Sequence, residues 1–287
     1  MLRAFRNANE SVLEACWGAI KSSPPCSLAE FSLRGLAAST KQAVTQTRSD
    51  GTAPRFYKKV DVGPVQGKDY GYTVMLDGRP LKSAAGRPLV LPNRYLALAV
   101  AAEWEWQDSR RIQPATMPMM TLTATAIDQP KPRAKVIKEL LGYIDTDVVV
   151  CRDDPGTELA IRQEQAYKPL VAWANSFFGI QLLPSTSIFG SNQAESTTSQ
   201  IHEYLTGLDN WKLGLADAMV CGCRSLVIGL ALLNNKITVK EAMSISRLEE
   251  ELQIEHWGLV EGAHDLDIAD MKMKLAAATM FMRGLRM

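Results

Sequence analysis

The sequence predicts an α+β protein, in which a small β-rich N-terminal domain is followed by an all-helical C-terminal domain. Between residues 55 and 92, short runs of aromatic and β-branched residues are separated by turns that contain Gly or Pro. Beyond residue 157, apolar residues recur every three to four positions, as they do on the buried face of a helix. The break Asp153-Asp154-Pro155-Gly156 separates the two patterns. We therefore expect a β-rich domain with some helices over 55–152 and a helical domain over 157–287.

Composition excludes several classes of protein. Of the 287 residues, 46% are hydrophobic and 22% are charged, which is the balance of a globular protein with a core of ordinary size. The net charge of +1 gives no global attraction to nucleic acid or to an anionic membrane, so we expect no nucleic-acid partner.

The first 50 residues differ from the rest of the chain. Residues 1–49 hold six Lys or Arg against three Glu, and the chain opens with Met1-Leu2-Arg3-Ala4-Phe5-Arg6. Apolar groups beside arginines are typical of a mitochondrial or chloroplast presequence, whereas the three glutamates favour a native tail. We interpret 1–50 as a mitochondrial presequence (transit peptide).

Local signals place the main elements. Tyr70–Leu76, the turn Asp77-Gly78 and Arg79–Leu81 predict a β-hairpin, and 145–151 is expected to be a last strand. Four helices are predicted from such signals. Asn93 and Thr157 are each expected to cap one, the long apolar run Asp209–Leu233 forms the third, and the capping box Thr238-Val-Lys-Glu241 opens the fourth. The last of these helices should bury Leu248, Leu252 and Leu259, and a final helix is expected over 267–281.

The segment Leu213–Leu233 is long and apolar enough to span a bilayer. However, Asp217 and Arg224 lie inside it, and charges at membrane depth are costly. Gly214, Gly222 and Gly229 lie nearly on one face of it. We therefore predict a buried helix whose glycines allow a neighbouring helix to approach closely, and no stable membrane insertion.

Enzymatic signatures are largely missing from the sequence. It contains no Gly-rich loop of the Walker or dinucleotide type, and no Gly-x-Ser-x-Gly motif. Glu261-x-x-His264 matches one half of a di-iron carboxylate site, but His202 and His256 lack the matching Glu. We expect no catalytic residue, metal or cofactor. The alternative is a metal-dependent hydrolase or oxidase that uses this Glu/His cluster.

Residues 244–270 are strongly acidic, with eight Asp or Glu against the single Arg247. Such a run most often forms a solvated helix face, and the alternative is a recognition surface for a partner that carries arginines. Trp104 and Trp106 form a second unusual feature. On a helix their side chains point about 200° apart, so one can pack while the other is partly exposed.

Several motifs, which occur in the same order as in a known family, resemble the assembly factors for the α subunit of mitochondrial F-type ATP synthase. They are Arg55-Phe-Tyr-Lys58, Leu76-Asp-Gly-Arg-Pro-Leu-Lys82, Glu103-Trp104, Thr125-Ala-Ile-Asp128, and Ser246-Arg-Leu-Glu-Glu-Glu-Leu-Gln-Ile-Glu-His-Trp-Gly258 followed by Glu261-x-x-His-Asp265. The resemblance implies a chaperone of the mitochondrial matrix that binds the α subunit, prevents its aggregation before assembly with the β subunit, and catalyses no reaction. It also implies that an acidic side chain of the last block matters, for which Glu249 is the best match and Glu255 the next.

The expected partner-binding residues lie in this last block. They are Glu249, Glu250, Glu255, Trp257, Glu261, His264 and Asp265. Trp104, which directly follows Glu103, is the match to the tryptophan of the family motif, and it is expected to be structural as a large buried ring.

If residues 1–50 form a presequence, deleting them should leave the thermal unfolding transition of the recombinant protein unchanged while abolishing import into isolated mitochondria. The motivation is their positive charge and their lack of sustained apolar periodicity. A large fall in melting temperature would instead show that the segment is part of the fold.

Overall fold

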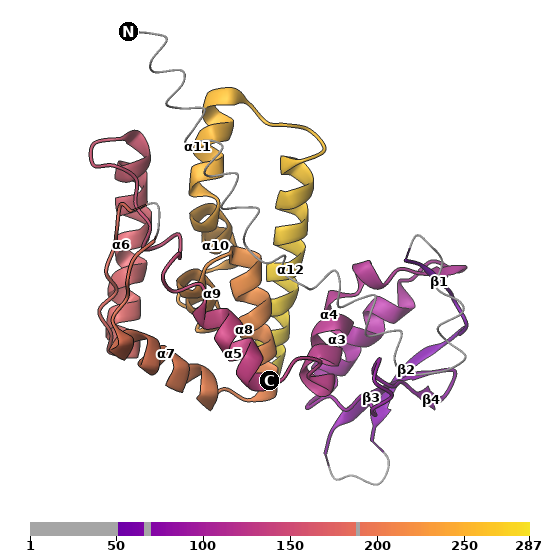
Figure 1. Ribbon diagram of the computed structural model, residues 1–287. Coiled ribbons are helices and arrows are strands. Elements are labelled where there is room, and N and C mark those ends of the chain that lie inside the picture. Colours follow the sequence, from indigo (N-terminus) through magenta and orange to yellow (C-terminus); the bar gives the residue numbers. More distant parts are fainter. Residues whose placement is uncertain (1–50, 66–69, 188–189) are drawn as a thin grey trace.

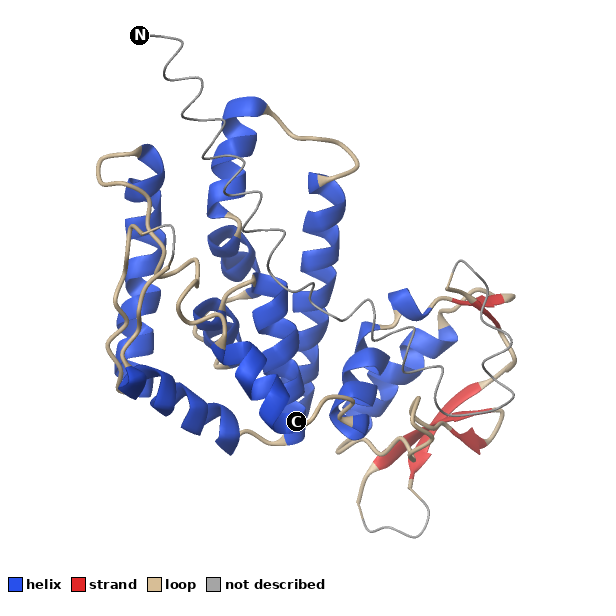
Figure 2. Cartoon of the chain, in the orientation of Figure 1, coloured by secondary structure: helices blue, strands red, loops and turns tan. Residues whose placement is uncertain are grey.

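The computed structural model describes residues 51–65, 70–187 and 190–287, so the predicted presequence lies outside the described residues. The predicted α+β class is confirmed (Figures 1 and 2). Short strands occur between residues 53 and 112, and the later part of the chain is helical. Two sides of the molecule are distinguished in Figure 1, a small strand-bearing part with α3 and α4, and a larger helical body.

Two small antiparallel sheets make up the β structure. The first has the order β2 (Val60–Pro64), β3 (Tyr72–Leu76) and β4 (Arg79–Pro80), and the second pairs β1 (Ala53–Pro54) with β5 (Arg111–Ile112). The predicted hairpin is confirmed, since Leu76 pairs with Arg79. Asp77 and Gly78 both have positive φ, 49° and 76°, as a two-residue turn of this kind requires.

Two helices connect the sheets to the rest of the protein. Helix α3 (Arg94–Glu105) packs against β2 and β3, and α4 (Pro118–Asp128), which follows the short 3₁₀ helix η2 (Pro114–Thr116), packs against α3. The predicted cap is confirmed, because the Asn93 side chain accepts a hydrogen bond from the Leu96 amide at 3.0 Å. Its amide nitrogen also donates to the carbonyl of Gly284 at 2.6 Å, which ties the start of α3 to the end of the chain.

Eight helices form the helical body. They are α5 (Arg133–Leu141), α6 (Glu158–Phe178), α7 (Glu195–Gly207), α8 (Asn210–Cys223), α9 (Leu226–Leu233), α10 (Val239–Ser246), α11 (Leu248–Trp257) and α12 (His264–Leu285). Helices α8 and α9 lie at its centre, with α12 and α4 against α8 and with α6 and α10 against α9. Because α4 packs on both α8 and α12, one core continues from the strand-bearing part into the helical body.

The apolar run 213–233 is buried, as predicted, but it forms two helices instead of one. Arg224 adopts a left-handed conformation with φ 53° and ends α8, and the side chain of Ser225 caps α9. Every residue of α9 is buried, and it folds back so closely on α8 that a Cβ on Gly229 would lie 2.7 Å from the backbone of Val220. Close approach is also confirmed at Gly222, against Leu275, but not at Gly214. Within the described ranges, no helix combines the length and the apolar character that crossing a membrane requires.

Three other predictions were wrong in detail. The capping box of Thr238 and Glu241 is confirmed, but the helix that begins there is interrupted at Arg247, which separates α10 from α11. Leu259 is exposed instead of buried, because Gly258 ends α11 with φ 85°. The final helix is longer than 267–281. Residues 145–151 form turns instead of a strand, because the buried Asp147 accepts hydrogen bonds from Val149, Ser225 and Val227 and so holds this segment against the start of α9.

The chain enters the helical body earlier than the predicted boundary at 153–156. Helix α5, at residues 133–141, packs against α7 and α8, and Val149 and Val150 are buried in the main core. The strand-bearing part therefore comprises the strands, α3 and α4.

Trp104 and Trp106 lie in very different surroundings. Trp104 is half-buried, and it packs against the main core and against a smaller hydrophobic cluster that contains Tyr57. Its ring lies 5.5 Å from that of Tyr57, whose hydroxyl donates a hydrogen bond to the Trp104 carbonyl at 2.6 Å. The side chain of Trp106 is 88% exposed.

Replacing Trp104 with Arg should lower the free energy of unfolding by roughly 3–5 kcal/mol, because a packed ring is lost and a charge is placed among apolar groups. The matched control is Trp106→Arg, which should change stability by less than about 0.5 kcal/mol because its side chain lies in water. Urea unfolding of both variants provides the measurement. Equal losses would show that Trp104 does not have the packing role assigned to it.

Glu103 links α3 to the start of α4. Its two carboxylate oxygens accept hydrogen bonds from the amides of Met119 and Met120 at 2.7 and 2.8 Å. Burial raises the pKa of Glu103 from 4.5 to about 7, despite these two hydrogen bonds, which act in the opposite direction. The folded protein therefore binds a proton here more tightly than the unfolded chain does.

A raised carboxyl pKa contributes stability below pH 4.5, and this stability is lost as the pH rises through about 7. The shift corresponds to at most roughly 3 kcal/mol. Glu103→Gln should therefore flatten the decline of unfolding free energy between about pH 5 and pH 8. The exposed Glu105→Gln on the same helix is the control. Parallel pH profiles for the wild type and Glu103→Gln would contradict this assignment.

Candidate functional site

The predicted partner-binding residues lie together at one end of the helical body. This end, which we call the arm, comprises α11, the connection 258–263 and the first turn of α12 (Figure 1). In Figure 1, α11 and the start of α12 stand at the end of the body away from the chain's C-terminus. Helix α11 packs against α6, and this contact supports the arm from one side.

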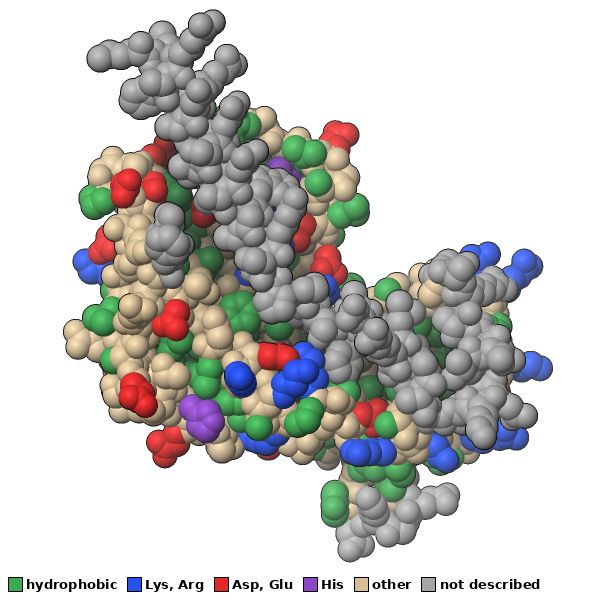
Figure 3. Space-filling model, in the orientation of Figure 1, with side chains coloured by type: hydrophobic (Ala, Val, Ile, Leu, Met, Phe, Trp, Pro, Cys, Tyr) green, Lys and Arg blue, Asp and Glu red, His purple; other side chains and the backbone are tan. Residues whose placement is uncertain are grey.

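Large apolar side chains are exposed on the arm. Trp257 is 73% exposed, and Leu259, Val260 and Leu266 beside it in sequence are exposed as well. Together these four residues form what we call the apolar tip. Figure 3 shows hydrophobic side chains on the outer surface of this end of the body. Because apolar groups gain free energy when they leave water, a contiguous exposed group of this kind indicates a binding surface.

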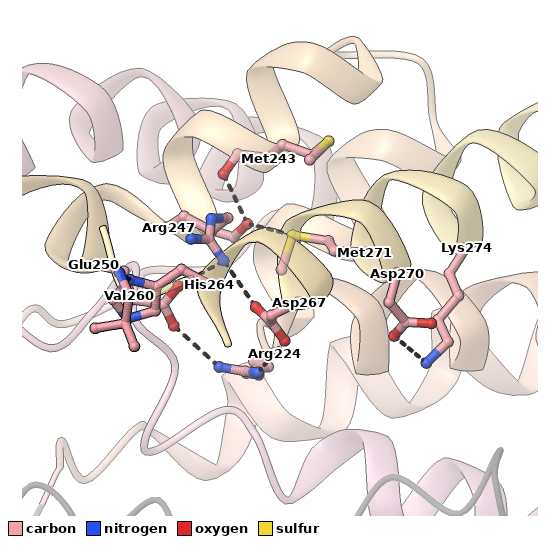
Figure 4. Close-up of polar contacts among 11 residues, drawn as sticks. Arg224, Met243, Arg247, Glu250, Val260, His264, Asp267, Asp270, Met271 and Lys274 are labelled. Atoms are coloured by element: carbon pink, nitrogen blue, oxygen red, sulfur yellow. Dashed lines mark hydrogen bonds and ion pairs between the residues drawn. The ribbon is translucent and has the colours of Figure 1, made fainter. Parts of the chain in front are cut away.

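The stem of the arm is held by four charged side chains from three parts of the helical body (Figure 4). Arg247, between α10 and α11, is only 3% exposed, and its Nη1 lies 2.8 Å from Glu250 and 2.7 Å from Asp267 of α12. Arg224, at the end of α8, lies 3.2 Å from the same two carboxylates. Each acid thus bridges two arginines, and the network fixes α11 relative to α8 and α12.

A second ion pair joins the arm to α6. Arg162 contacts both oxygens of Glu255, at 2.9 and 2.7 Å, and also Glu158 at 2.7 Å. The hydrogen bond from Arg162 lowers the pKa of Glu255, so this carboxylate stays ionised. Glu255 is therefore engaged within the protein, although all three side chains remain at the surface.

Glu249 differs from its neighbours. In the described part of the chain it forms no hydrogen bond or ion pair, whereas Glu250 contacts two arginines. The residue is exposed, but the protein around its carboxyl group partly desolvates it and raises its pKa, and the negative charges of Asp153 and Glu250 act in the same direction. A carboxylate in this position gains from an incoming positive charge.

The remaining predicted residues lie on the connection and on the start of α12. Glu261 and Asp265 are exposed, and His264 accepts a hydrogen bond from the Val260 amide at 3.2 Å, which helps to shape the connection. In the part of the chain that the structure describes, no group of three or more His, Cys, Asp and Glu side chains is arranged to hold a metal ion. Among the described residues, Cys151 and Cys223 form no disulfide.

Sequence reasoning missed three apolar residues of the tip, and it missed Arg224 of the stem and Arg162 of α6. Gly258 was the available signal for the tip, since a glycine with positive φ ends α11 and turns Leu259 and Val260 outward. The contacts of Arg162 with Glu255 and of Arg224 with Glu250 leave no local pattern, because these partners lie 93 and 26 residues away, although Arg162 also pairs with Glu158 one helical turn before it.

Comparison with known proteins points to one family. Residues 54–175, which span the strands and the chain as far as α6, match the family described as ATP12 chaperone protein. The mitochondrial protein atp12 of Schizosaccharomyces pombe is 29% identical over 73% of this chain and 76% of its own length. ATP12 of Saccharomyces cerevisiae, also mitochondrial, is 26% identical over 80% of this chain and 84% of its own.

The chain is similar to the ATP12 chaperone family over residues 54–175, and to mitochondrial ATP12 proteins over most of its length. Solved structures agree with this similarity. The crystal structure of Atp12 from Paracoccus denitrificans covers 80% of this chain and 97% of its own, with a TM-score of 0.71 and 29% identity. A protein of Agrobacterium tumefaciens covers 95% and 99%, with a TM-score of 0.76 and 25% identity.

This similarity supports a role as a chaperone of ATP synthase assembly. The names of both yeast relatives support a mitochondrial location. The matched range 54–175 ends in α6, so the arm lies beyond it. What the arm binds is therefore argued from its own geometry.

Proposed function

We propose that this chaperone acts in the mitochondrial matrix, where the arm holds the α subunit of the ATP synthase F₁ sector and prevents its aggregation before the β subunit joins. The observation that carries the proposal is the apolar tip, formed by Trp257, Leu259, Val260 and Leu266. A subunit that awaits its partner exposes apolar interface, and this surface aggregates unless it is covered. The role is one of binding, with no catalytic step.

Charge around the tip supports capture of a partner with a positively charged rim. Glu261 and Asp265 are exposed beside the apolar residues in sequence, and Glu249 and Glu251 are exposed in the first turn of α11, which leads to the tip. Complementary charge accelerates association and penalises wrong partners, while the apolar contact supplies most of the affinity. A small tip also suits a chaperone that must release its client, because transient complexes bury modest areas.

The first test removes the apolar contact. Trp257→Ala combined with Val260→Ser should leave the melting temperature unchanged, since both side chains are exposed, and should abolish suppression of α-subunit aggregation, measured by light scattering during dilution from denaturant. Trp106→Ala, which removes an equally exposed indole from the strand-bearing part, is the matched control and should retain full suppression. Full suppression by the double variant would rule out the tip as the client site.

The second test reverses a charge. Glu249→Lys should leave the fold nearly intact, because Glu249 has no partner to lose, and should weaken α-subunit capture by roughly tenfold or more through repulsion at the interface. Glu250→Lys is the contrasting variant. It should lower the melting temperature, because the buried Arg247 then loses one of its two acidic partners. A Glu249→Lys protein that melts normally and still suppresses aggregation would return Glu249 to the role of a solvated surface residue.

A further inference from the structure

A second exposed aromatic surface lies on the strand-bearing part and plays no role in the proposed function. Trp106 is 88% exposed and Phe56 is 69% exposed. They come from segments 50 residues apart that are joined by hydrogen bonds. The Arg55 guanidinium donates to the carbonyls of Glu105 and Gln107, on either side of Trp106, at 3.3 and 2.7 Å.

Basic residues occur in the same two segments as these rings. The Arg55 amide donates to the Arg110 carbonyl at 3.2 Å, and Arg111 pairs with Pro54 in the β1–β5 sheet. Lys58, Arg110 and Arg111 are all exposed. We call the six residues Arg55, Phe56, Lys58, Trp106, Arg110 and Arg111 the basic aromatic patch. Glu105 and Asp108 are exposed in the same segment, so the local net charge remains positive.

Charge is divided between the two parts of the chain. Residues 51–128, which make up the strand-bearing part, carry ten Lys or Arg and seven Asp or Glu, a net charge of +3, whereas residues 129–287 carry 16 and 20, a net charge of −4. The overall charge of +1 conceals this division. A negatively charged surface would therefore attract the strand-bearing part and repel the acidic arm, so that the molecule would approach it in one orientation.

We propose that the basic aromatic patch docks peripherally on a bilayer that contains anionic lipids, with Trp106 and Phe56 in the headgroup region and the arm directed away from the membrane. Amphipathic aromatic rings favour the membrane–water interface, and nearby Lys and Arg add electrostatic attraction to anionic headgroups. Protein interfaces are also rich in aromatic and Arg side chains, so binding of an acidic protein is the outcome that the vesicle experiments must exclude. No helix needs to insert.

The probe is a set of vesicles made of phosphatidylcholine alone or with about a fifth phosphatidylglycerol. The full chain should co-sediment with the anionic vesicles and be released as salt rises from about 50 mM to about 500 mM. Arg110→Glu combined with Arg111→Glu should lower the partition coefficient at least about tenfold. The matched control, Lys135→Glu with Lys138→Glu on α5, makes the same change in net charge elsewhere on the surface and should bind as the wild type does.

Trp106 itself reports the depth of docking. The difference in fluorescence between the wild type and Trp106→Phe is the emission of Trp106, and lipids brominated in their acyl chains should quench it. The difference between the wild type and Trp257→Phe is the emission of Trp257, and the same lipids should leave it unchanged. Residues 1–50 are present in every variant, so any membrane affinity of that segment is common to all of them. An unquenched Trp106, or equal binding by the two charge-reversed pairs, overturns the proposal.

These results are independent of α-subunit capture. The Arg110/Arg111 variant should still suppress aggregation fully, because the arm is intact. If it instead loses suppression and the wild type binds neither kind of vesicle, the patch is a protein contact and the membrane proposal is wrong.

Discussion

The buried guanidinium of Arg247 is the constraint on which the arm depends. It lies where the chain leaves α10 and enters α11, and a charge removed from water in this way is tolerated only with close partners of opposite sign. Glu250 and Asp267 supply those partners from the two helices of the arm. The direction of α11 and the start of α12 are thus set by the same side chain. Without it, two helices that bury little at their outer ends would have few reasons to stand together.

This arrangement resolves a conflict between stability and binding. The apolar tip lowers the solubility of the protein and adds nothing to its core, so the stem beneath it must be stabilised by other means. Ion pairs at the stem and at Arg162 provide direction without covering the apolar surface. The main core, built on α8, α9 and α12, is elsewhere and can stay closely packed. Binding surface and core are therefore separated along the length of the helical body.

The sequence predicts those features whose cause is local. Asp77-Gly78 specifies its turn because both residues must adopt positive φ, and Asn93 and Thr238 specify helix starts through their own side chains. The break at Arg224 was missed because apolar periodicity continues through it, although Ser225 before a new apolar run was a usable capping signal. The acidic residues of the arm were found by their density. Which of them are engaged and which are free depends on arginines distant in sequence, and only the folded chain shows this.

Helix α12 runs without interruption from the arm to the hydrogen bond between its Gly284 and Asn93, at the start of α3. Its 22 residues make a rod of roughly 33 Å. The number of residues in this helix therefore fixes how far the arm is rotated about the helix axis relative to the strand-bearing part. Inserting a single residue in its middle would turn one end by about 100° relative to the other. The number of residues between Asp267 and Gly284 therefore sets both the distance and the angle between the arm and the strand-bearing part.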